Sequence, residues 1–182
     1  MTTKFFKLTL FVLFATTSSL FFAACDNNDD DETEQENITT VQVHLVGAGI
    51  DQEFEWSDLD GPGGNNPVID TIVVPAMTSD ISSHIHVYDR SKTPEVDITE
   101  EIEEESLEHL FTYAITGANV SITYDDTDAN GKPLGIKTIW TSLGASTGTI
   151  RIILFHEPSN KDNLSDPGGE ADFDVTFPVK IQ

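Results

Sequence analysis

The sequence predicts a mostly β fold: a single immunoglobulin-like β-sandwich with one short helix, preceded by a cleaved signal peptide and a disordered acidic tether. Eight or nine short runs alternate apolar and polar side chains, as strands with one buried face do. Turn residues separate these runs, and only one segment has the start signal and composition of a helix. We expect the signal peptide at residues 1–24, the lipidated cysteine and tether at 25–37, and the sandwich at 38–182.

The segment 1–24 has the three parts of a secretory signal. Lys4 and Lys7 make its start basic, residues 8–22 are almost wholly apolar, and small residues precede Cys25. A transmembrane helix needs about 20 apolar residues and usually has charged residues on both sides. Here the chain that follows is strongly acidic, so a cleaved signal is favoured over a retained anchor helix.

The end of this segment indicates lipidation. Phe22-Ala-Ala-Cys25 resembles the lipobox of bacterial lipoproteins, in which a cysteine after small residues becomes the lipidated N-terminus. Cys25 is the only cysteine in the chain, so it has no partner for an internal disulfide. We predict that Cys25 carries a lipid that binds the protein to a membrane. The alternative is a chance cysteine near an ordinary signal peptidase site.

Residues 26–37 contain no apolar side chain, so burial cannot offset their ordering entropy and we expect disorder. The acidic residues nearest to Cys25 are Asp26, Asp29, Asp30, Asp31 and Glu32. An acidic run directly after the lipidated cysteine resembles the surface-export signal of lipoproteins in Bacteroidota. We favour that interpretation over a plain spacer, because a neutral spacer would serve equally well as a tether.

The chain as a whole is strongly acidic, with a formal net charge of −23. Such a charge repels nucleic acid and anionic lipid head groups. It suits cations, cationic patches on a partner, or simple solubility. We therefore expect no nucleic-acid partner, and membrane attachment through the lipid on Cys25.

Alternation marks the strands of the first half. Apolar residues occupy every second position of 38–46 from Val41, and a short apolar pair follows at 54–56. A longer apolar run covers 68–74, and residues 81–87 place apolar side chains on one face. Each of these segments has the period of a strand.

One helix is expected at residues 98–108. Asp97 is a typical N-cap residue, and Glu100 stands at the third helical position of a capping box. Six glutamates then occupy this segment. Clustered anions are best tolerated at the helix start, where the helix dipole favours negative charge.

Strands are expected again at 109–115, 120–124 and 134–140. Residues 150–155 are apolar at nearly every position, which predicts a central strand buried on both faces. The cleanest alternation lies at 173–181. Pro178 cannot donate a ladder hydrogen bond, so this strand should lie at a sheet edge or form a bulge there.

Six segments of the body stand out together: Asp97-Ile-Thr-Glu-Glu-Ile, Glu108-His-Leu-Phe-Thr-Tyr, Asp128-Ala-Asn-Gly-Lys-Pro-Leu-Gly, Ala145-Ser-Thr-Gly-Thr-Ile-Arg-Ile, His156-Glu-Pro and Phe173-Asp-Val-Thr-Phe. In these segments the chain resembles a group of small acidic surface lipoproteins of Bacteroidota. Members often carry the label of a type 1 periplasmic-binding fold, but that fold needs alternating strands and helices in two lobes. The resemblance implies a surface partner of a TonB-dependent outer-membrane receptor.

Two histidines are the first candidate metal ligands. His84 and His86 are two residues apart on one strand, which places both imidazoles on one face about 7 Å apart at Cα. A metal site needs a third ligand from another strand, and His44 also lies opposite the apolar residues of its own strand. The alternative is a polar, solvated strand face.

The segment Asp126-Thr-Asp128-Ala-Asn130-Gly131 matches the opening of a calcium loop. Lys137 stands where the bidentate glutamate belongs, so any calcium binding should be weak. The alternative is a hairpin connection, for which Asn-Gly is a strong signal. Two further histidines, His109 and His156, are expected as hydrogen-bonded residues at the edge of the core.

No motif pairs a nucleophile with a base, so catalysis is not expected. The long loops 58–67 and 157–170 are candidate binding loops at the ends of the sandwich. We predict a lipid-anchored, surface-exposed binding or accessory protein of an outer-membrane uptake system. The alternative is a structural acidic surface lipoprotein without a small ligand.

Overall fold

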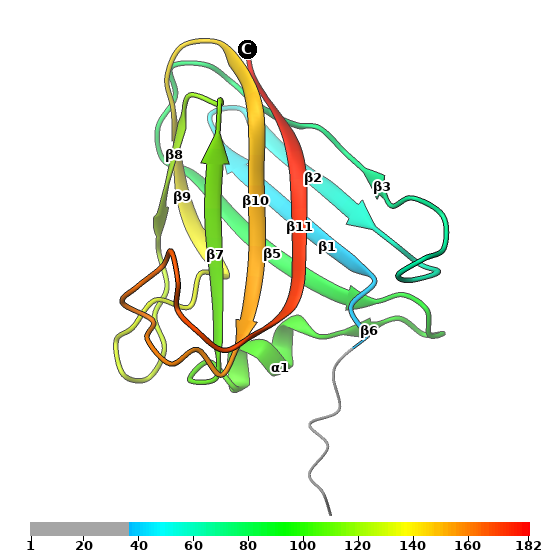
Figure 1. Cartoon of the computed structure of the whole chain (residues 1–182). Helices are drawn as coiled ribbons and strands as arrows, with labels where there is room; N and C mark the ends of the chain where they lie inside the picture. Colours follow the sequence, from blue (N-terminus) through cyan, green and yellow to red (C-terminus); the bar gives the residue numbers. More distant parts are fainter. Residues whose placement is uncertain (1–36) are drawn as a thin grey trace, which may run out of the picture. The chain divides into compact units, whose positions relative to one another are not determined.

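The computed structural model describes residues 37–182. The predictions for the signal peptide, for Cys25 and for the acidic residues 26–36 lie outside these described residues. Over the described part the chain is mostly β and folds into two sheets with one short helix (Figure 1). This arrangement confirms the predicted β-sandwich class, whereas the finer immunoglobulin-like assignment stays a prediction.

The elements follow one another in the order β1 Thr40–Gly47, β2 Ile50–Ser57, β3 Val68–Ile69, β4 Ile72–Val74, β5 Ile81–Asp89, β6 Val96–Asp97, α1 Thr99–Glu104, β7 His109–Thr116, β8 Val120–Tyr124, β9 Lys137–Ser142, β10 Ser146–His156 and β11 Glu170–Ile181. The first sheet has the order β3-β2-β1-β5-β9-β8, and β6 pairs with β5. The second sheet has the order β4-β11-β10-β7. All pairs are antiparallel except that of β4 with β11.

The core lies between the two sheets and follows the predicted alternation. Val41, Val43 and Leu45 of β1 have exposed fractions of 0%. The same holds in the second sheet for Ile150, Ile152 and Leu154 of β10, which form one cluster with them. Complete burial of such side chains contributes about 1.5–3 kcal/mol each. The buried Trp140 of β9 places its indole N–H 2.9 Å from Thr138 Oγ1, so its polar atom is satisfied.

The run 68–74, expected as one strand, is two short strands in different sheets. β3 pairs with β2 in the first sheet, and β4 pairs with β11 in the second. The chain changes sheets at Asp70, whose N–H donates to Glu55 O at 2.8 Å and whose Oδ2 accepts from Glu55 N–H at 3.0 Å. A largely apolar run without Gly or Pro carries no signal of this crossover, because apolar residues are equally suited to a strand in either sheet.

The helix is shorter than the expected 98–108. It begins at Thr99 and ends at Glu104, and its last turn has no basic residue. Because anions are unfavourable at a helix C-terminus, the continuing glutamates end the helix, and Glu108 N–H donates to Glu105 O in a turn. Asp97 is not the N-cap residue, which is Ile98; its Oδ1 instead accepts from Thr99 N–H at 2.9 Å.

Two expectations for the last strands have different outcomes. β10 is fully buried on its inner face, but Ile153 and Phe155 on its outer face are only half-buried, so the prediction of burial on both faces is wrong. β11 has β10 along one side and meets β4 only at residues 179–181. The sheet order places β11 between β4 and β10, so the predicted edge strand is wrong for residues 179–181, and Pro178 is the last residue of β11 that pairs with β10 alone.

Candidate functional site

The outer surface of the first sheet gathers the predicted histidines. We call the outward side chains of β1, β5 and β9 the histidine face, defined by His44, Ser82, His84, His86, Tyr88 and Lys137. Inward positions of β5 such as Ile85 and Val87 are buried, so the alternate positions face outward. The strand register places His44 opposite His84, and His84 opposite Lys137 on the other side. Three strands thus contribute to one row across the sheet.

Along β5 the rings form a ladder. The ring centroids of His84 and His86 are 4.3 Å apart, and the rings of His86 and Tyr88 stack with centroids 6.2 Å apart. The guanidinium of Arg90 lies 4.9 Å from the Tyr88 ring centroid, a cation–π arrangement. The ladder presents a series of flat rings in line on a rigid strand.

Charged groups frame the histidine face. His44 Nε2 lies 2.8 Å from Asp51 Oδ1, and Lys137 Nζ donates to Glu103 Oε1 at 3.1 Å. The same glutamate oxygen is 3.9 Å from His84 Nε2, too far for a hydrogen bond. The helix α1 therefore supplies an anion to the rim of this face, and this anion is already paired with Lys137.

His84 is the unusual residue of the face. Its Nε2 is enclosed and has no hydrogen-bond partner among the described residues. Burial lowers the pKa of His84 to about 4, helped by the neighbouring His86 and Lys137. The imidazole is therefore neutral at physiological pH, and its Nε2 finds no partner within residues 37–182.

A hollow of about 270 Å³ opens beside this imidazole. His44, Val46, Ser82, His84, Asp125 and Lys137 contribute to its lining. A second hollow of about 570 Å³ lies over the loop 125–133 and shares Asp125 with the first. The site offers a neutral acceptor or donor at His84, a cation at Lys137 and an anion at Asp125, which suits a small polar ligand.

The predicted metal ligands do not form a preorganised metal centre. His84 and His86 lie side by side as expected, but no group of three or more His, Cys, Asp or Glu side chains in residues 37–182 is arranged to hold a metal ion. His44, the expected third ligand, has its Nε2 engaged by Asp51. Two imidazoles alone leave a metal ion short of the ligands that a structural site uses.

The predicted calcium loop binds its own backbone. Asp126 accepts from the N–H groups of Gly135 and Lys137 at 2.7 and 2.8 Å. Asp128 Oδ1 accepts from the N–H groups of Asn130 and Lys132, both at 2.9 Å. These carboxylate oxygens hold the loop in shape, and Gly131 supplies the turn with a φ of 73°. Asn130 takes part in this loop through its backbone N–H.

The cation beside Asp128 comes from the chain itself. Lys161 Nζ donates to Asp128 Oδ2 at 2.9 Å and also to Ser106 O. The side chains of Lys161 and Asp128 have exposed fractions of only 6% and 2%. The pairing has a physical reason: a buried carboxylate needs a compensating charge, and Lys161 in the loop 157–169 supplies it as an ammonium group.

The remaining histidines form a second pair on the other sheet. His109 and His156 stack with ring centroids 5.0 Å apart, and His109 is buried with Nδ1 3.2 Å from Glu105 O. These contacts fit the expected core-edge role. Asp172 lies beside them at the bulge of β11, where the register shifts opposite Leu154 and Phe155. Burial raises the pKa of Asp172, although the two histidines lower it.

Searches for related proteins return no match among family models, curated proteins or solved structures. Within residues 37–182 no helix is long and apolar enough to cross a membrane.

Proposed function

We propose that this chain is a lipid-anchored binding protein of the bacterial cell surface, accessory to an outer-membrane uptake receptor, and that its ligand docks on the histidine face. The anchor rests on Cys25 and on the acidic residues that follow it. The uptake receptor as partner rests on the resemblance to surface lipoproteins of Bacteroidota.

One observation supports the binding role above the others. His84 Nε2 is enclosed beside an open hollow, and no side chain or backbone group of the described part of the chain pairs with it. A buried polar atom left unpaired costs about 1–3 kcal/mol, so most such atoms in proteins are paired. A ligand that hydrogen-bonds to this nitrogen would recover that cost. The neutral state of His84 keeps it available over the physiological pH range.

The surroundings define the chemistry of the ligand. Lys137 and Asp125 put opposite charges on the same hollow, which favours a ligand with both donor and acceptor groups. The Tyr88 and His86 rings stack on each other along β5 and do not line the hollow, so its polar and charged groups define the ligand. A small polar molecule with both donor and acceptor groups fits this set.

The test is native mass spectrometry of the protein purified from its own host. Wild type should carry a bound species that His84→Ala loses. Thr141→Ala is the matched control, because Thr141 is on the outer face of β9 away from the hollow, and this variant should retain the species. Crosslinking on intact cells should recover an outer-membrane receptor. Absence of any bound species, together with no crosslinked receptor, would support the purely structural alternative.

A further inference from the structure

The strand β2 is an open sheet edge for most of its length. β3 pairs with it only at Trp56 and Ser57, and the chain then crosses to the second sheet. Residues 50–54 of β2 pair with β1 on one side and with no described strand on the other. A row of backbone groups is therefore free for a further strand.

The direction of these backbone groups follows from Asp70. Asp70 bonds to both the N–H and the C=O of Glu55, so both groups of Glu55 point away from β1. Backbone groups of an antiparallel strand alternate in direction. Asp51 and Glu53 therefore present their N–H and C=O groups on the same open side, where no hydrogen bond from a described residue meets them.

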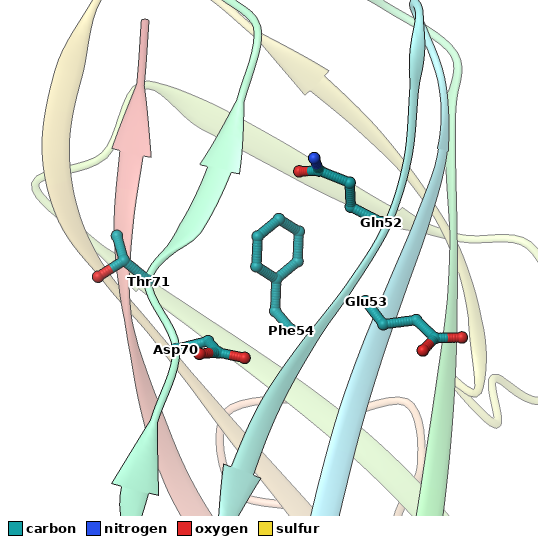
Figure 2. A pocket seen from close by; sticks show the side chains of 5 residues that line it. All are labelled: Gln52, Glu53, Phe54, Asp70 and Thr71. Atoms are coloured by element: carbon teal, nitrogen blue, oxygen red, sulfur yellow. The ribbon is translucent and has the colours of Figure 1, made fainter.

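A groove runs beside this edge. Figure 2 shows Phe54 and Gln52 in the gap between β2 and β4, with Asp70 and Thr71 across from them. The hollow measures about 380 Å³. Phe54 is 7% exposed and provides an apolar floor. The groove is therefore bounded by β2 on one side and by the segment that leads into β4 on the other, with the Phe54 ring at its base.

The charge of the groove restricts its occupant. Glu53 and Asp70 contribute to the lining, and no Lys, Arg or His does. Asp51 lies on the same edge, exposed. A second copy of this chain pairing edge to edge would bring these carboxylates against their own copies, and charged edge residues are a common way to prevent such pairing. The complementary occupant carries positive charge.

We propose that residues 50–54 of β2 form a docking site for an extended peptide segment of a partner protein, with Lys or Arg at alternate positions, which adds as a strand to the first sheet. The backbone groups of Asp51 and Glu53 pair with the segment and set its register. Its basic side chains face the carboxylates on the outer face of the sheet. The uncharged residues between them point inward and contact Phe54 in the groove.

A designed peptide tests this site on the folded protein. In the test peptide lysine alternates with threonine or valine, and in the control peptide glutamate replaces lysine. Fluorescence anisotropy should show binding of the basic peptide that weakens with salt, and no binding of the acidic one. Hydrogen exchange of the Asp51 and Glu53 amides should slow on binding. Absence of binding at millimolar peptide, or binding without slower exchange at these amides, overturns the proposal.

Two variants of one residue separate backbone pairing from charge. Glu53→Pro removes an outward N–H, and proline is tolerated on an edge strand where the N–H faces solvent. It should weaken binding at least tenfold. Glu53→Gln keeps the N–H and should weaken binding only a few-fold. Exchange of the Phe54 amide, which faces β1, reports whether Glu53→Pro keeps its fold. Equal affinity of wild type and folded Glu53→Pro also contradicts the proposal.

Discussion

The buried ion pair of Lys161 and Asp128 gives the sharpest prediction for stability. Its side chains are 6% and 2% exposed, and Lys161 also donates to Ser106 O. Asp128→Asn keeps the shape of the side chain but leaves the lysine ammonium buried without its anion. Removing one partner of such a pair costs about 3–5 kcal/mol. For a domain of this size that loss lowers the melting temperature by on the order of 10 °C.

The comparison with Lys161→Met isolates the pair from packing. Methionine retains the length of lysine and leaves Asp128 with its two backbone donors, so the cost should be smaller, about 1–3 kcal/mol. The double variant should be less destabilised than the two single losses added together, because it buries no unpaired charge. Urea unfolding followed by tryptophan fluorescence measures all four proteins. A loss below about 1 kcal/mol for Asp128→Asn, the range of exposed pairs, refutes this reasoning.

The same pair predicts a pH dependence. Burial raises the pKa of Asp128, but the Lys161 ammonium and the N–H groups of Lys132 and Asn130 outweigh it, so the pKa is lowered. A carboxyl with a lowered folded pKa stabilises the fold above its unfolded pKa of about 3.9 and loses this contribution as the pH falls further. Wild type should therefore lose stability faster than Asp128→Asn below about pH 4. Parallel pH profiles for the two proteins would contradict this assignment.

Four other outcomes follow from the sequence and the structure. Cys25→Ala should abolish labelling by radioactive palmitate and release the protein from membranes; continued labelling would refute lipidation. Alanine at all four acidic positions of 29–32 should protect the protein from protease added to intact cells, unless the run is only a spacer. A His84→Ala/His86→Ala double variant should bind zinc at least tenfold more weakly, about 1.4 kcal/mol, and equal affinity would remove both residues from consideration. Millimolar calcium should leave the melting temperature unchanged, because Lys161 already neutralises Asp128; a rise that Asp128→Asn abolishes would restore the calcium interpretation.

Local periodicity was sufficient for most strands. β1, β5 and β11 lie where alternation places them, because one face of each must be buried and the period of a strand is two. The C-terminal end of α1 was harder to predict. A capping signal marks where a helix starts, but it does not show after how many glutamates the accumulated negative charge ends the helix. The crossover at Asp70 has no local signal, since it depends on β2 and β11 being present to pair with β3 and β4.

The candidate site was predictable only within one strand. That His84 and His86 lie side by side follows from their spacing on one strand. That His44 and Lys137 lie in one row with His84 can be predicted only if β5 is known to lie between β1 and β9. These strands are not consecutive in sequence, so local patterns cannot order them. The Lys161–Asp128 pair likewise joins two loops separated by 33 positions. Its sequence signal was an acidic turn, which equally resembled a calcium loop.

The parallel pairing of β4 with β11 has a consequence for the timing of folding. Residues 72–74 find their partners only at residues 179–181, in the last strand of the chain. The chain loses the entropy of closing this long loop before the contacts between β4 and β11 stabilise it, and this slows folding. The second sheet cannot be completed while its C-terminal strand is still being made.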